Sequence, residues 1–340
     1  MTGIQKPSVS AVFVLEIGDI VGPMLAGWLA RGHRVAAIVT RPPAAGHRFS
    51  LGARRRRNRL TQVVRRYLGG AAVERLHVNT MRDWDAIAPR LAATGADVLV
   101  CYGFPRLIPD RILTLFPNGG VNLHPTLLPH YRGPSPLLHL LVDDAYGQHG
   151  GVTLHRMTAA YDEGEVLAQI PLGERFWTSR ETYLAGVSAA MRRLVVEVVP
   201  EVCLGGTTGE PQPGGSFPWA TLQPGPLTID SRWTSAKLRK IQSFLGSRAQ
   251  LAVLVGTTPV AVAQRLMRLG PPTGRPPMRM PMMVSFDLAD GRVLHLTMNR
   301  LARQAQRWQR GSPARVEIAD DELELRRFGG GGSSRPPPTD

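Results

Sequence analysis

The stretch DVLVCYGFPRLIPDRILTLFPNGGVNLH, residues 97–124, decides the fold. It begins and ends with largely apolar runs of strand length, and a short helical segment at 111–116 separates them. Apolar strands with helices between them are typical of a parallel sheet that is covered on both faces. Two similar runs precede the stretch, at residues 11–15 (AVFVL) and 34–40 (RVAAIVT). The pattern predicts an α/β domain with a doubly wound, mostly parallel sheet over residues 10–206.

Helical and alternating patterns complete this domain. Helical spacing predicts four longer helices, at residues 20–31, 59–67, 83–93 and 181–204. Two further strands, at 151–157 (GVTLHRM) and 165–171 (EVLAQIP), alternate as in a hairpin whose loop is 158–164.

The chain changes character after residue 206. Residues 207–228 are dense in Gly, Pro and Thr and are interpreted as a linker. A helix at 235–245 and short strands around an Asp290–Gly291 turn predict a smaller, β-rich C-terminal domain over 229–328. The tail at 329–340, GGGGSSRPPPTD, cannot build a packed core and is expected to be disordered.

The composition limits the class of protein without naming a partner. The formal net charge is +15, which favours anionic partners such as nucleic acid, membrane surfaces or small phosphates. Cys101 and Cys203 lie in apolar runs and form no disulfide framework or metal-ligand spacing, so we expect no metal and a reducing cytoplasm. No apolar run reaches the roughly 20 residues that cross a bilayer, so no membrane partner is expected.

The segment VNLHPTLLPHYRGPSP, residues 121–136, places two polar side chains at the end of a strand. Asn122 and His124 are two residues apart, so they share one face of the strand. Ligands of open α/β sheets bind at this carboxyl end. The spacing alone fits a functional pair, and it equally fits a buried histidine beside an asparagine that caps a turn.

Asp162 follows in the predicted hairpin loop. If the hairpin packs beside the Asn/His strand, Asp162 reaches His124 and holds its imidazole in one orientation. The histidine would then accept a proton from an attacking amine, and Asn122 would donate to the oxygen that becomes negative in a tetrahedral intermediate. An ordinary aspartate in the turn before Gly164 is the alternative interpretation.

These segments together resemble the formyltransferase family that uses 10-formyltetrahydrofolate. The pattern Asn-x-His-x-[Ser/Thr]-Leu-Leu-Pro-x-x-Arg-Gly, then Gly-Val-Thr, then Asp-x-Gly, occurs in order between Asn122 and Gly164. The stretch at 101–109 (CYGFPRLIP) is similar to the family's segment before the catalytic strand. The resemblance implies that Asn122, His124 and Asp162 are catalytic, that no metal is needed, and that 10-formyltetrahydrofolate is the co-substrate. It also implies folate contacts from Tyr102, Gly103, Phe104, Thr126, Leu127, Leu128 and Pro129.

Some positions depart from the family pattern. Glu163 stands where threonine is common, and Pro125 replaces a small residue. The turn at 16–19 is a poor copy of the family's opening turn, and it lacks the glycine pattern of a nicotinamide-binding site. Beyond residue 205 the match is poor apart from Ile229-Asp230-x-x-Trp233.

The acceptor is the least determined part of the function. Two sets of arginines would suit phosphate groups, and they equally fit a solvated surface: residues 54–57 with Arg59, Arg65 and Arg66, and Arg275, Arg279, Arg303, Arg307 and Arg310. The C-terminal segment lacks a clear five-stranded OB pattern, which favours a small-molecule amine, either an amino sugar or an amino-acid-derived amine. Formylation of initiator methionyl-tRNA, transfer to water, and an inactive folate- or nucleic-acid-binding protein are the alternatives.

Overall fold

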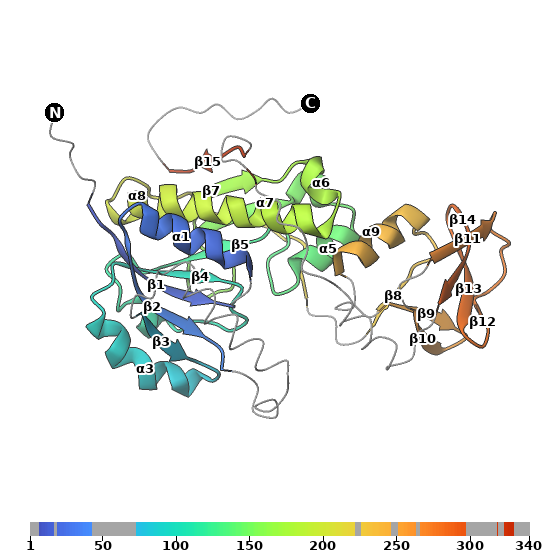
Figure 1. Ribbon diagram of the computed structural model, residues 1–340, viewed down its shortest axis with the longest axis horizontal. Coiled ribbons are helices and arrows are strands. Elements are labelled where there is room, and N and C mark those ends of the chain that lie inside the picture. Colours follow the sequence, from blue (N-terminus) through green and yellow to red (C-terminus); the bar gives the residue numbers. More distant parts are fainter. Residues whose placement is uncertain are drawn as a thin grey trace.

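One eight-stranded sheet carries the candidate site (Figure 1). The computed structural model describes residues 7–16, 19–42, 73–221, 226–245, 251–262, 266–296, 318 and 323–329. The sheet has the strand order β15-β7-β6-β5-β4-β1-β2-β3. Its strands are β1 (Ser10–Leu15), β2 (Arg34–Thr40), β3 (Glu74–His77), β4 (Val98–Tyr102), β5 (Gly120–His124), β6 (Gly151–Arg156), β7 (Val166–Pro171) and β15 (Arg326–Arg327).

The pairing of these strands confirms the predicted mostly parallel sheet. Strands β1 to β5 pair in parallel, whereas β6 pairs antiparallel with both β5 and β7. The predicted hairpin is therefore β6 and β7, and it lies directly beside the strand that carries Asn122 and His124. The short strand β3 was not predicted, because its sequence ERLH has charged residues and only one buried apolar side chain.

Helices cover both faces of the sheet, and β1 shows how the sequence places them (Figure 1). Phe13 belongs to the core beneath α1 (Gly22–Ala30) and α7 (Arg180–Arg193), and its ring meets Trp28 edge to face at 5.9 Å. Val14 belongs to the opposite core, beneath α3 (Met81–Ala93) and α4 (Asp110–Leu113). Successive residues of a strand point to opposite faces, so a continuous apolar strand supplies both cores.

Among the remaining helical segments, some match a predicted helix with shifted bounds, and others were not predicted. The predicted helix at 181–204 is α7 followed without a break by a π-helical turn, η4 (Leu194–Val198), and α8 (Val199–Cys203). The helix predicted at 59–67 lies outside the described residues. Five further helical segments lie within the described residues: η1 (Asp19–Val21), α5 (Pro136–Val142), α6 (Tyr146–His149), η3 (Glu174–Trp177) and α9 (Ser235–Leu245). Of these, α5, α6 and η3 were not predicted.

The C-terminal region is rich in β-strands, as the sequence predicts, and its described strands pair antiparallel except for β8, which pairs in parallel with β9. A three-stranded sheet has the order β10-β9-β8, and a four-stranded sheet has the order β11-β14-β13-β12. Their bounds are β8 (Leu227–Thr228), β9 (Leu251–Val255), β10 (Thr258–Val262), β11 (Leu266–Gly270), β12 (Met278–Arg279), β13 (Met283–Leu288) and β14 (Gly291–Leu296). The predicted turn at Asp290–Gly291 joins β13 to β14. Helix α9 lies between these strands and the large sheet, where it contacts α5 and α7 (Figure 1).

The last described residues return to the large sheet. Strand β15 pairs with β7 at its edge, and the Phe328 N–H donates to the Leu167 carbonyl at 2.9 Å. The division into a catalytic domain (10–206), a linker (207–228), a C-terminal domain (229–328) and a tail (329–340) stays a proposal. Residues 326–328, which this division assigns to the C-terminal domain, pair with the large sheet, because β15 and Phe328 supply backbone partners to the outer edge of β7.

Candidate active site

Strand β5 presents Asn122 and His124 on one face, at the end of the strand that leads into the loop 125–135. His124 is 4% exposed, and its Nε2 lies 2.9 Å from the carbonyl oxygen of Tyr131 in that loop. A carbonyl only accepts, so Nε2 carries a proton and donates it. In the neutral imidazole the other nitrogen, Nδ1, then holds a lone pair.

Asp162 reaches this face from the loop between β6 and β7. Its backbone is left-handed, with φ of 55°, a conformation that aspartate adopts more readily than most residues. Gly164 allows the tight return of the chain, because a Cβ at that position would lie 1.9 Å from the carbonyl oxygen of Arg156. The Asp-x-Gly spacing therefore has a steric reason, and the resulting loop holds a carboxylate whose side chain is 12% exposed.

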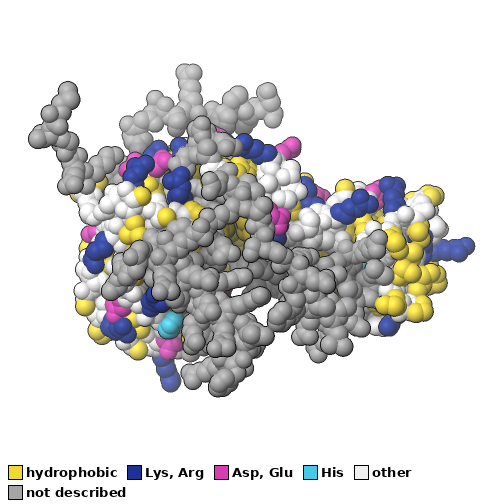
Figure 2. Space-filling model, viewed as in Figure 1, with side chains coloured by type: hydrophobic (Ala, Val, Ile, Leu, Met, Phe, Trp, Pro, Cys, Tyr) yellow, Lys and Arg dark blue, Asp and Glu magenta, His cyan; other side chains and the backbone are white. Residues whose placement is uncertain are grey.

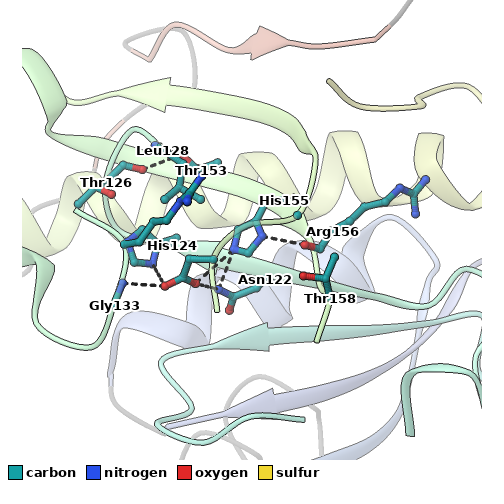
Figure 3. Close-up of polar contacts among 12 residues, drawn as sticks. Asn122, His124, Thr126, Leu128, Gly133, Thr153, His155, Arg156 and Thr158 are labelled. Carbon is teal, nitrogen blue, oxygen red and sulfur yellow. Dashed lines mark hydrogen bonds and ion pairs between the residues drawn. The ribbon is translucent and has the colours of Figure 1, made fainter. Parts of the chain in front are cut away.

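The Asp162 carboxylate connects the predicted residues through contacts to Asn122, His124 and Gly133, which Figure 3 labels. One oxygen, Oδ2, lies 3.5 Å from His124 Nδ1 and accepts the backbone N–H of Gly133 at 2.9 Å. The other, Oδ1, accepts from Asn122 Nδ2 at 3.3 Å. The structure thus brings Asn122, His124 and Asp162 together, and their catalytic role stays a prediction.

His155 on β6 is a fourth member of the cluster that the sequence did not single out. It is 2% exposed and pairs across the strands with Asn122, whose Nδ2 lies 3.0 Å from His155 Nε2. The His155 Nδ1 donates to the Arg156 carbonyl at 2.8 Å, so Nε2 accepts from Asn122. Its signal was available, since GVTLHRM places Thr153 and His155 on the same face of β6.

Thr153 joins the cluster to the loop that follows β5. Its hydroxyl donates to the Thr126 carbonyl at 2.6 Å and accepts the backbone N–H of Leu128 at 3.0 Å. Gln169 of β7 donates to the same hydroxyl and to the Leu128 carbonyl, at 3.0 and 2.8 Å. Buried hydrogen bonds of this kind hold the loop 125–135 in one conformation.

Burial and neighbouring charges set the protonation of the pair. Burial lowers the pKa of His124 below its usual value, against the opposing effects of the Asp162 carboxylate and the Tyr131 carbonyl. Burial alone would raise the pKa of Asp162, but His124, His155 and the Gly133 N–H hold that pKa well below its usual range. At neutral pH the site therefore contains a neutral imidazole beside an ionised carboxylate, which is the state of a proton acceptor.

The residues predicted to contact folate fall into two groups. Tyr102, Gly103 and Phe104 end β4 and follow it, beside β5, with Cys101 in register with Asn122. In the loop 125–135, Thr126 and Leu128 are 0% and 5% exposed, and the Thr126 hydroxyl donates to the His130 carbonyl. A contact from these two residues would therefore come through their backbone. The folate contacts of both groups, including Leu127 and Pro129, stay predictions.

Several other expectations fall outside what the structure describes. The arginines at 54–57 with Arg59, Arg65 and Arg66, and Arg303, Arg307 and Arg310, lie outside the described residues. Arg275 and Arg279 are described and exposed.

Within the described ranges, no group of three or more His, Cys, Asp and Glu side chains is placed to hold a metal ion. Nor does this part of the chain contain a helix that is long and apolar enough to cross a membrane.

Comparison with known proteins decides the family. A family model described as formyl transferase matches residues 10–188, which include the whole cluster. The chain belongs to the formyl transferase family. It is therefore an enzyme that transfers one-carbon formyl groups.

The sequence similarity to individual relatives extends beyond the residues that the family model matches. Methionyl-tRNA formyltransferase of Halorhodospira halophila is 30% identical over 272 residues, which cover 76% of this chain and 80% of that protein. The enzyme of the same name from Dechloromonas aromatica is 29% identical over 264 residues, which cover 76% and 78%.

Solved structures show the same fold at low identity. HypX from Aquifex aeolicus is 15% identical with a TM-score of 0.55, and the match covers 92% of this chain but about half, 49%, of HypX. A likely sugar N-formyltransferase from Mycobacterium tuberculosis is 17% identical with a TM-score of 0.52, covering 78% of this chain and 100% of that one.

Proposed function

We propose that this formyl transferase moves the formyl group of 10-formyltetrahydrofolate to an amine, with Asn122, His124 and Asp162 as catalytic residues. The observation that carries the proposal is the buried cluster at the end of β5, in which a neutral imidazole faces an ionised carboxylate at 3.5 Å. Binding alone would not require a proton acceptor and an amide donor at one point, so the cluster favours an active enzyme over an inactive binding protein.

The reaction follows from the positions of these groups. The amine nitrogen attacks the formyl carbon, a nitrogen–carbon bond forms, and the formyl oxygen becomes negative. Nδ1 of His124 accepts the proton that the amine loses, and Asp162 stabilises the resulting imidazolium. When the bond from the formyl carbon to the folate nitrogen breaks, the same proton passes to that nitrogen, so the enzyme returns to its starting state.

Asn122 is assigned to the developing negative oxygen. Its two N–H groups face His155 and Asp162, and the contact with Asp162, at 3.3 Å, is longer than the contact with His155, at 3.0 Å. To donate to the formyl oxygen, Asn122 would therefore give up its longer contact with Asp162. A donor that is already oriented in a buried site stabilises an oxyanion more than a solvated donor does.

The donor is proposed from the family and from a structural relative. HypX from Aquifex aeolicus has been solved in complex with tetrahydrofolic acid, and its fold matches this chain with a TM-score of 0.53. In this chain, the segment 102–104 follows β4 beside the strand that carries Asn122. This segment and the backbone of the loop 125–135 would contact the folate.

A small-molecule amine, an amino sugar or an amino-acid-derived amine, is the proposed acceptor. The described C-terminal strands and the connection between β12 and β13 expose apolar side chains (Figure 2), namely Met267, Leu269, Met278 and Met282. Arg268 and Arg279 are interspersed among them, so the surface is mixed and not uniformly cationic. Nucleic-acid backbones favour surfaces dominated by Lys and Arg.

Initiator methionyl-tRNA is the second candidate acceptor. It is favoured by the relatives named methionyl-tRNA formyltransferase, whose similarity covers 76% of the chain and so extends beyond the catalytic sheet. The net charge of +15 is also compatible with binding RNA.

One assay tests the donor and separates the acceptors. The protein would be mixed with 10-formyltetrahydrofolate and either charged initiator tRNA, a panel of free and nucleotide-linked amino sugars, or amino-acid amines, and release of tetrahydrofolate would be followed. We expect turnover with a small amine. Turnover with tRNA alone would replace the proposed acceptor by the second one. Folate binding without transfer to any acceptor, including water, would contradict the catalytic assignment and support the inactive binding protein.

A further inference from the structure

The segment 207–221, which its composition predicts to be a linker, packs against the loop that follows β5. The Tyr131 N–H donates to the Pro218 carbonyl at 2.9 Å, and the Ala220 N–H donates to the Arg132 carbonyl at 2.7 Å. The Ser135 N–H donates in turn to the Ala220 carbonyl at 3.1 Å. The second half of the segment is therefore paired with the loop that carries Gly133, the donor to Asp162.

The first half of the same segment is paired with the hairpin. Glu210 and Val166 exchange both of their backbone hydrogen bonds, at 2.8 and 2.9 Å. Val166 begins β7, four residues after Asp162. The segment therefore contacts both structures that meet at the Asp162 carboxylate, namely the hairpin that bears it and the loop that donates to it.

The side chain of Gln212 lies between these two contacts and joins them. Its Nε2 donates to the backbone carbonyls of Asp162 and Gly164, both at 2.8 Å. Its Oε1 accepts from Nε and Nη2 of Arg132, at 3.2 and 2.7 Å. One amide thus uses both of its N–H groups on the Asp162 loop and its oxygen on the neighbour of Gly133.

The Asp162 loop depends on such support. Asp162 has a positive φ, and Gly164 passes against the Arg156 carbonyl, so the loop holds a conformation that few sequences adopt unaided. The loop is 29 residues away from its partner Gly133 along the chain. A tie between the two loops fixes the distance from the carboxylate to His124 more firmly than either loop does by itself.

We infer that Gln212 is a positioning residue for formyl transfer, which holds the Asp162 carboxylate against His124 by tying the hairpin loop to the loop after β5. This inference rests on the proposed function, because it assumes that the Asp162–His124 pair acts in the reaction. Gln212 itself touches no reacting atom and acts through Asp162. The segment 207–221 then belongs to the active site in addition to connecting it to the C-terminal strands.

Loss of this support is expected to change the pKa of His124. The charged or titratable groups that influence it are Asp162 from the hairpin loop, His155 from β6 and Arg132 from the loop after β5. Of these, Asp162 raises the pKa of His124, whereas His155 and Arg132 lower it. When Asp162 moves away, the pKa of His124 falls further, and the imidazole becomes a weaker proton acceptor.

The test uses Gln212→Leu, which keeps the size of the side chain and removes all four hydrogen bonds. We expect kcat to fall by up to about 10²-fold while KM for the folate donor changes little, because small displacements of a catalytic group have effects of that size. The acidic limb of the pH–rate profile should move to lower pH. The matched control is Glu210→Gln, because Glu210 is exposed and pairs with Val166 through its backbone.

A second readout does not depend on activity. An NMR titration of the His124 imidazole in the wild type and in Gln212→Leu should show a lower pKa in the variant. An unchanged pKa, or a fall in kcat without a shift of the acidic limb, would overturn the positioning role. If the wild type transfers no formyl group, the proposed function fails, and the titration still decides whether Gln212 holds Asp162 in place. Should Gln212→Leu not fold, Gln212→Glu keeps the Arg132 contacts and loses donation to both carbonyls, so a similar fall in kcat is expected.

Discussion

The large sheet and the C-terminal strands differ in which side chains they bury. Strands β5 and β6 bury His124, Thr153 and His155, and each of these has hydrogen-bond partners. The edge strands β11 and β12 of the C-terminal sheet expose Leu269 and Met278, which are 61% and 52% accessible. The first region thus buries a connected group of polar side chains. The second also buries the polar Ser285 and His295, but it differs in leaving large apolar side chains exposed on its edge strands.

The buried polar cluster and the exposed apolar side chains have different physical meanings. Burying polar groups is costly unless every one of them is satisfied, so a connected buried cluster indicates a requirement for defined geometry. Exposed apolar side chains gathered on one surface indicate contact with another molecule. We therefore assign the chemistry to the large sheet and propose that the C-terminal strands contribute to the choice of acceptor.

The largest expected difference between the regions is in stability. Leu99 of β4 is 0% exposed, so Leu99→Ala should lower the free energy of unfolding by about 2–5 kcal/mol. Met278→Ala on β12 should change it by less than about 0.5 kcal/mol, because the side chain is already half in water. Urea unfolding followed by far-UV circular dichroism would compare them. Equal losses would mean that Met278 is covered in solution.

The next effect concerns Asn122 alone. Asn122→Ala removes the proposed oxyanion donor, so kcat should fall by about 10²–10³-fold, or about 2.7–4 kcal/mol, with little change in donor affinity. Asn118→Ala is the matched control, because Asn118 precedes the opposite end of β5 and donates to the Asp97 carbonyl. Steady-state kinetics with donor binding measured in parallel would check it. A parallel loss of binding and turnover would assign Asn122 to folate binding.

The smallest effect is a shift in pH dependence. In Asp162→Asn the charge that raises the pKa of His124 is lost, so that pKa falls further below its usual value. The acidic limb of the kcat profile should therefore move to lower pH, while kcat on the plateau decreases because the imidazolium loses its partner. The decrease should be smaller than for Asn122→Ala, since an asparagine still accepts from Gly133. A profile identical to that of the exposed Asp110→Asn variant would rule out the pairing.

The sequence could predict the features of the large sheet that leave a local pattern. The buried strands were predicted because continuous apolar runs of strand length, such as VLVCY, can be recognised in the sequence without tertiary information. The candidate cluster was predicted because Asn122 and His124 share a face of one strand, because Asp162 follows in a short hairpin, and because the three residues match the pattern of the family. His155 was overlooked although it lies in the quoted segment GVTLHRM, since a single histidine on an apolar strand is equally typical of a core residue.

Other features could not be predicted from local patterns. Residues 207–221 have the composition of a linker, and their pairing with two distant loops depends on tertiary contacts that composition does not encode. The same holds for β15, whose two arginines pair with β7 from the far end of the chain. Gln212 has no local signal at all, because its four hydrogen bonds go to residues 48 to 80 positions away.

The most direct test of the account is a single-turnover measurement on His124→Ala. Enzyme in excess over 10-formyltetrahydrofolate would be mixed with the acceptor found for the wild type, and donor affinity would be measured on the same samples. The account predicts a transfer rate lower by about 10²–10⁴-fold with unchanged donor affinity, because the proton acceptor is lost and the folate contacts remain. A transfer rate equal to that of the wild type would contradict it.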